Sequence, residues 1–125
     1  MITLARKYER ITNVQLLALI KFLKKKAREH RAKIWGYVAE LLGKPRRLRP
    51  QVNISKINRH TQPGDTVVVP GKVLGAGILK HKVNVAAFSF SETAKRKIID
   101  AGGKVLNIEE LVEQNPKGSN VKIII

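Results

Sequence analysis

The chain has 125 residues, 25 of them lysine or arginine and 9 of them aspartate or glutamate, so its formal net charge is +16. A hydrophobic content of 43% is typical of a globular domain and excludes a purely disordered tail, and the length predicts one domain over residues 1–125. Cysteine is absent, which excludes disulfide scaffolds, thiolate zinc sites and cysteine nucleophiles, and no apolar run approaches the ~20 residues of a membrane span.

The first predicted element is a basic amphipathic helix. Thr12-Asn13-Val14-Gln15 is a capping-box pattern, because a hydroxyl side chain is followed three residues later by glutamine. The apolar residues Leu16, Ile20, Leu23 and Ala27 then recur at helical spacing, while the lysines between them lie largely off that stripe. We therefore expect a helix of about four turns with a basic outer face.

A second, shorter helix is predicted from Ile34 to Leu42. Gly43 suits the position after its end, where a left-handed backbone is least unfavourable for glycine. Trp35 and Tyr37 are expected to pack in the core or between helices rather than to stack on bases. The segment 44–50 contains two prolines, which forbid a regular helix and predict an extended basic loop.

From Gln51 onward, short strands are predicted to alternate with short helices. The expected strands are residues 52–54, 66–69, 83–88, 104–106 and 121–125. Pro63-Gly64-Asp65 has the composition of a turn, Pro70-Gly71 is expected to end the second strand, and Gly75-Ala76-Gly77 predicts a tight loop. This part, residues 51–125, is therefore predicted to be the α/β part of the domain.

Three short helices are predicted within this part. Ser55 is expected to cap a helical turn through Arg59, and Ser91 is expected to cap a helix that ends at Gly102. Asn107, followed three residues later by Glu110, predicts the start of the last one.

Catalytic and metal-binding motifs are nearly absent. Gly75-Ala76-Gly77 lacks the third small residue of a dinucleotide fingerprint, because Lys80 occupies that position. His30, His60 and His81 are scattered along the chain, with no carboxylate or histidine at ligand spacing. We therefore predict that the protein is not an enzyme and has no metal site, no cofactor and no small-molecule substrate.

The positive charge is concentrated in the first part of the chain. Residues 1–50 hold 14 basic and 3 acidic residues, whereas residues 51–125 hold 11 basic and 6 acidic ones. Such an excess on a small domain indicates a polyanionic partner. The first part, predicted to be helical, is therefore the part more strongly expected to face a nucleic acid.

Three basic clusters are the candidate contacts. Arginine binds a phosphate with paired hydrogen bonds and stacks on exposed bases, whereas lysine acts as a mobile point charge. The clusters are Lys24, Lys25, Lys26, Arg28 and Arg31 on the first helix and its loop; Lys44, Arg46, Arg47 and Arg49 in the proline-bounded loop; and Lys72, Lys80 and Lys82 around the Gly75–Gly77 turn.

The kind of nucleic acid remains open on these residues alone. A helix that reads a DNA groove presents polar side chains to base edges, whereas the exposed face here is mostly lysine, which contacts phosphates without reading sequence. Folded RNA recognised by its shape is the better match. The alternatives are a sequence-neutral, chromatin-type nucleic-acid-binding protein and an RNA-modifying enzyme.

The second part of the chain resembles the ribosomal L-fifteen/L-eighteen-e family. The resemblance rests on Lys72-Val73-Leu74-Gly75-Ala76-Gly77-Ile78, on Val83 and Val85, and on the stretch from Phe90-Ser91 to Gly102. Further stretches are similar to the archaeal and eukaryotic L-eighteen-e branch. They are Trp35-Gly36 through Arg47, Val52 through Arg59, Val68 through Gly71, and Asn115-Pro116 with Gly118-Ser119. The resemblance covers about residues 12–125, and the short length is that of the archaeal form.

This resemblance implies a structural protein of the large ribosomal subunit without enzymatic activity. Its implied partners are ribosomal RNA and neighbouring large-subunit proteins, its implied location is the ribosome in the cytoplasm, and no membrane is involved. The implied fold is an irregular β-β-α layered domain with an N-terminal helical segment. Gly75 and Gly77 would then let the backbone approach RNA closely, while Lys72, Lys80 and Lys82 neutralise phosphates around them.

Overall fold

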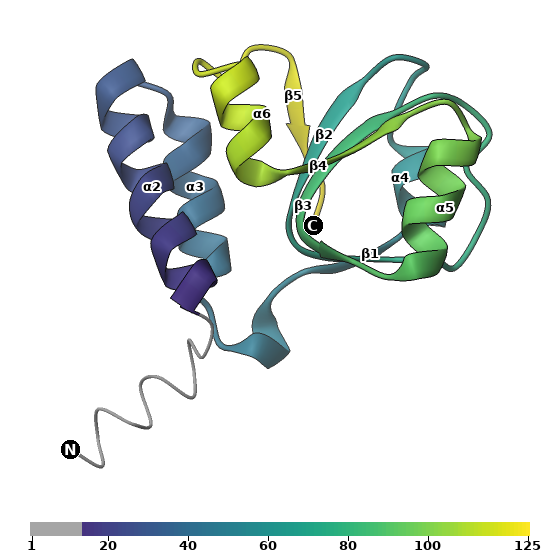
Figure 1. Cartoon of the computed structure of the whole chain (residues 1–125), viewed down its shortest axis with the longest axis horizontal. Helices are drawn as coiled ribbons and strands as arrows, with labels where there is room; N and C mark the ends of the chain where they lie inside the picture. The colour runs from purple at the N-terminus through teal and green to yellow at the C-terminus, as the bar shows by residue number, and fades with distance from the viewer. Residues whose placement is uncertain (1–13) are drawn as a thin grey trace.

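The computed structural model describes residues 14–125, so the predicted N-cap Thr12 lies outside the described residues. After an N-terminal pair of helices, short strands and helices follow one another, with β2 and β3 consecutive (Figure 1). In chain order they are α2 (Val14–His30), α3 (Lys33–Leu42), the 3-10 turn η1 (Arg46–Leu48), β1 (Gln51–Asn53), α4 (Ile54–Arg59), β2 (Thr66–Leu74), β3 (Asn84–Phe90), α5 (Glu92–Asp100), β4 (Lys104–Asn107), α6 (Ile108–Gln114) and β5 (Val121–Ile123).

The strands form one five-stranded parallel sheet in which β2 is central. One edge of β2 pairs with β3, which in turn pairs with β4. Its other edge pairs with β5 over Thr66–Val68 and with β1 over Lys72–Leu74. The α/β fold class and the N-terminal helical segment are therefore confirmed. Within residues 14–125, no helix is long and apolar enough to cross a membrane.

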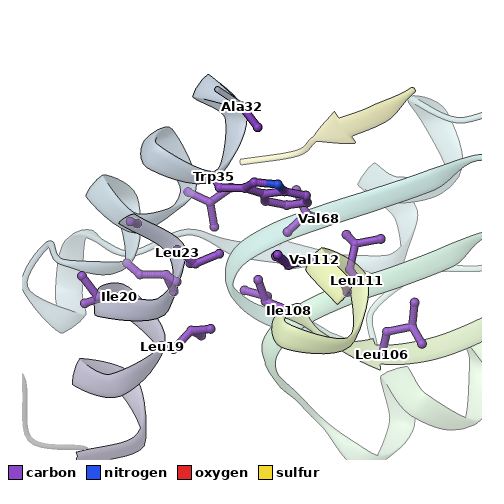
Figure 2. Packing of buried hydrophobic residues seen from close by; sticks show 14 of the residues in the cluster. Leu19, Ile20, Leu23, Ala32, Trp35, Val68, Leu106, Ile108, Leu111 and Val112 are labelled. Atoms are coloured by element: carbon purple, nitrogen blue, oxygen red, sulfur yellow. The ribbon is translucent and has the colours of Figure 1, made fainter. Parts of the chain in front are cut away.

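The sheet separates two hydrophobic clusters. Because successive side chains of a strand point to opposite faces, Val68 packs in one cluster while Val67 and Val69 pack in the other. The first cluster joins α2, α3 and α6 to the sheet, and Figure 2 shows Trp35 lying over Val68 between them. The second cluster joins α4 and α5 to the opposite face.

The helix starts in the second part are those that the sequence predicts, with one exception. Ser91 Oγ accepts a hydrogen bond from the Ala94 amide at 3.1 Å, and Asn107 and Glu110 form a reciprocal capping box at 2.8 and 3.1 Å. Ser55, however, is not a cap, because α4 begins at Ile54, two residues earlier than predicted, and Asn53 occupies the N-cap position.

The structure differs from the sequence prediction at Pro70-Gly71 and in the conformation of Gly43, although α3 ends at Leu42 as predicted. Strand β2 runs through Pro70-Gly71 instead of ending there, because its register with β3 shifts between Val69 and Lys72. Such an irregularity accommodates a proline that has no N–H to donate. Gly43 ends α3 in a right-handed conformation, with φ of −75°, so it does not use the left-handed freedom of glycine.

Candidate nucleic-acid interface

The lysine face of α2 is held outward by the burial of the opposite face. Leu16, Leu19, Ile20 and Leu23 are buried against the rest of the protein, which leaves the basic side chains in solvent. Of the predicted contacts, Lys24, Lys25 and Arg28 are exposed and Lys26 is half-buried. The predicted helix therefore presents its charges on one accessible surface.

Glu29 neutralises part of this surface. Its carboxylate lies 3.2 Å from the Lys26 ammonium and 3.8 Å from that of Lys25. The hydrogen bond from Lys26, followed by the charges of both lysines, lowers the pKa of Glu29. Within residues 14–125, no acidic side chain pairs with Lys21, Lys24 or Arg28, so these three basic side chains of α2 carry uncompensated charge.

Arg31 lies in the short connection between α2 and α3. Its backbone is left-handed, with φ of 52°, and the following Ala32 amide donates to the Ala27 carbonyl at 3.0 Å. A left-handed conformation is unfavourable for an arginine by about 1 kcal/mol compared with glycine. The exposed Arg31 side chain thus continues the basic surface beyond the end of the helix.

The proline-bounded loop was predicted to be extended, but it contains the 3-10 turn η1. Pro45 precedes this turn, and the Leu48 amide donates to the Pro45 carbonyl at 2.8 Å. This 3-10 turn is compatible with the flanking prolines because its hydrogen bonds are donated by the Leu48 and Arg49 amides and need no N–H from Pro45 or Pro50. Lys44, Arg46 and Arg47 are exposed, whereas Arg49 is half-buried.

The end of this loop contacts β2. The Lys72 amide donates to the Pro50 carbonyl at 3.1 Å, and a side chain at Gly71 would collide with that same carbonyl. Arg46, Arg49 and Lys72 consequently border one small cavity. Two clusters that are separate in the sequence therefore meet in space.

The same arrangement separates Lys72 from its sequence neighbours in the third cluster. Lys72 lies near the C-terminal end of β2, whereas the Lys82 carbonyl accepts a hydrogen bond from Gly64, ahead of the start of β2. Six residues of strand between Thr66 and Lys72 span ~20 Å. The Lys80 amide is held by Asn58 Oδ1 at 2.9 Å, and the Lys80 and Lys82 side chains are exposed.

The glycine loop is packed against the protein itself. A side chain at Gly75 would press on Thr93 of α5, and one at Gly77, whose φ is +101°, would collide with Ser55 of α4. The Ser55 amide donates to the Ala76 carbonyl at 3.0 Å. The close approach that these glycines permit is thus an approach to two helices of the fold.

Lys97 is a functional candidate that sequence reasoning missed. Its ammonium donates to the carbonyls of Gly75 and Gly77, each at 2.6 Å, and so ties the loop to α5. Nothing in the pattern around Lys97 indicates a contact 20 residues upstream. Lys97 is half-buried, and its charge offsets the two carbonyl dipoles of the loop.

Metal ligation has no visible basis in this part of the chain. Residues 14–125 contain no group of three or more histidine, aspartate or glutamate side chains placed to hold a metal ion. His81 Nε2 lies 2.7 Å from Thr61 Oγ1, which itself donates to the Ile57 carbonyl. This histidine therefore has an ordinary structural partner.

Comparison with known proteins identifies the family of this basic α/β protein. A family model described as ribosomal protein 60S L18 and 50S L18e matches residues 2–125, and the chain belongs to that family. The match begins at residue 2 rather than near residue 12, so the family resemblance covers more of the chain than its motifs indicate.

Archaeal proteins named large ribosomal subunit protein eL18 are close relatives. The one from Methanoregula boonei is 51% identical over 90% of this chain and 93% of its own length. Those from Pyrobaculum aerophilum and Methanococcus maripaludis are each 54% identical, over 91% and 90% of this chain and 93% and 94% of their own lengths. These relatives carry the name of a structural component of the ribosome.

Proposed function

We propose that this protein binds folded ribosomal RNA of the large subunit through three surfaces: the lysine face of α2, the loop around η1 with Lys72 beside it, and the exposed Lys80 and Lys82 in the segment between the glycine loop and β3. Its cations neutralise phosphates where RNA segments pack together, so that those segments stay folded. The whole chain acts as one RNA-binding unit, beside neighbouring ribosomal proteins, within the cytoplasmic ribosome. It needs no cofactor and turns over no substrate.

The observation that carries this proposal is the uncompensated charge around η1. Arg46, Arg47 and Arg49 lie within four residues of one another, and no acidic residue within residues 14–125 pairs with any of them. Arginines held so close repel one another unless an anion lies between them. Backbone phosphates of an irregular RNA supply that anion at any sequence, which suits recognition by shape.

The test is replacement of Arg46, Arg47 and Arg49 by glutamate, followed by measurement of incorporation into large subunits. We expect incorporation to fall by at least tenfold, because three attractive contacts become repulsive. A matched control replaces Arg96, Lys104 and Lys117 by glutamate, which makes the same change in net charge. These three residues are also exposed and lack an acidic partner within residues 14–125.

The control separates a specific surface from general basicity. An equal loss in both triple variants would indicate sequence- and site-neutral binding of the chromatin type. Undiminished incorporation of the η1 variant would exclude this loop as a major contact. Stoichiometric sedimentation of the unmodified protein with large subunits after a high-salt wash would further exclude a transiently associated RNA-modifying enzyme.

A further inference from the structure

A small cavity lies where the loop around η1 meets β2 and β3. Its volume is about 100 Å³, and it is bordered by the cationic residues Arg46, Arg49 and Lys72 and by Phe88 and Ser89 of β3. No acidic residue is among the described residues that line it. Three positive side chains therefore converge on one concave site without a negative partner.

One of these cations has an unsatisfied donor. Arg49 Nε is buried and has no hydrogen-bond partner among residues 14–125. Burial, and after it the nearby charge of Arg46, lowers the pKa of the Arg49 guanidinium. A buried N–H without an acceptor is unfavourable, and it becomes favourable when an anion supplies the acceptor.

The walls of the cavity are held in place by backbone contacts. Lys72 and Ser89 are register partners in the β2–β3 pair, so their side chains emerge side by side. On the other wall, the Arg49 amide donates to the Arg46 carbonyl at 3.3 Å, and the Pro50 carbonyl accepts from the Lys72 amide. Binding there would need little reordering of the chain.

The size of the cavity restricts its occupant. The cavity volume is about 100 Å³. Pockets for complete small-molecule ligands measure ~300–1,000 Å³. A single phosphate group fits this space, whereas a whole nucleotide does not.

We propose that the cavity between η1 and β2 binds one backbone phosphate of an RNA strand, held by Arg46, Arg49 and Lys72 with the Ser89 hydroxyl as a further donor. This inference rests on the proposed function and adds to it a particular site at which two basic segments share one phosphate. The sugar and base of that nucleotide then lie outside the cavity, next to the exposed Arg46.

The test is a double-mutant cycle on the full chain. Binding to large-subunit ribosomal RNA is measured for Arg49→Gln, Lys72→Gln and the double variant. Each single variant is expected to lose about tenfold in affinity. The double variant is expected to lose clearly less than the ~100-fold product, because both residues bind the same phosphate. Lys117→Gln is the control, and its effect should multiply with that of Arg49→Gln.

The outcomes separate this inference from the proposed function. If the unmodified protein failed to bind the RNA in a salt-dependent way, the proposed function itself would be wrong. If it bound but the Arg49 and Lys72 effects multiplied fully, only the shared-phosphate site would be overturned. Thermal unfolding of Arg49→Gln without RNA checks the fold, and we expect no loss of stability, since an unsatisfied buried donor is removed.

A second measurement distinguishes an RNA strand from a free anion. Inorganic phosphate is titrated into the unmodified protein while the amide resonances of Lys72 and Ser89 are followed. We expect no saturation at micromolar concentrations, because an isolated phosphate lacks the additional contacts of a strand. Saturation in that range would overturn the proposal and assign the cavity to a free anion.

Discussion

Trp35 and Tyr37 show how closely the environment of a single residue follows helical geometry. They lie two positions apart on α3, which turns the second side chain about 200° from the first. Trp35 is fully buried and donates from Nε1 to the Pro116 carbonyl at 2.7 Å, as its expected packing role requires. Tyr37 is 45% exposed, so it is not part of the core, and its packing between helices stays a prediction.

Asp65 is the residue whose charge most clearly supports a turn. Its Oδ2 accepts hydrogen bonds from the Gln62 amide and from the Lys122 ammonium, both at 2.8 Å. The first of these, and after it the second, lowers the pKa of the Asp65 carboxyl. Asp65 thus links the turn before β2 to β5, which pairs with β2 at the same end.

This link predicts a pH-dependent stability. Because the folded-state pKa of Asp65 lies below its unfolded value, its stabilisation is present above about pH 4 and is lost as the pH falls through the folded pKa. Asp65→Asn should therefore unfold at lower urea concentration than the unmodified protein at pH 7. The difference should shrink toward zero at the acid end of the titration.

Equilibrium urea unfolding at a series of pH values measures this effect. Asp100→Asn is the matched control, because Asp100 is exposed and forms no ion pair within residues 14–125. Its unfolding midpoint should follow that of the unmodified protein throughout. A difference for Asp65→Asn that stayed constant from pH 7 to pH 2 would show that the ionised carboxylate contributes nothing.

At the scale of elements, the periodic helices are predictable and the contacts between distant segments are not. The stripe of Leu16, Ile20 and Leu23 predicts α2, and the Asn107–Glu110 pair predicts the start of α6, because each signal lies within a few residues. The anchoring of the Gly75–Gly77 loop by Lys97 is a tertiary contact that no local pattern carries. The meeting of Arg49 with Lys72 is hidden for the same reason.

The ion pairs of α2 give a prediction of increased binding. Glu29→Gln removes the carboxylate that pairs with Lys25 and Lys26, and both ammonium groups become available to phosphates. We expect tighter binding to large-subunit RNA and a salt dependence steeper by about one unit in the slope of log K against log salt. Filter binding at several salt concentrations measures both quantities.

Glu113→Gln, an exposed position on α6, provides a control with the same change in net charge. It should raise affinity only slightly, since Glu113 pairs with no basic side chain among the described residues. Equal gains from the two substitutions would mean that binding responds to net charge alone. The α2 face would then have no particular role in the contact.

At the scale of the whole molecule, one sheet supports both the fold and the charged surface. Strand β2 contributes Val68 to the cluster under α2 and α3, and Val67 and Val69 to the cluster under α4 and α5. The Trp35–Pro116 hydrogen bond joins segments 81 residues apart. The described residues of the helical part, 14–50, and the α/β part, 51–125, are therefore expected to unfold together, as one domain would.

The net charge of +16 predicts that salt acts in opposite directions on folding and on RNA binding. Screening weakens the mutual repulsion of the cations in the free protein, so added salt should raise the urea midpoint of unfolding. The same salt should lower the affinity for RNA, because counterion release contributes less.

Trp35 fluorescence and far-ultraviolet circular dichroism should report a single shared unfolding transition at each salt concentration. A tryptophan transition that preceded the loss of helix would show that α2 and α3 detach from the sheet before it unfolds.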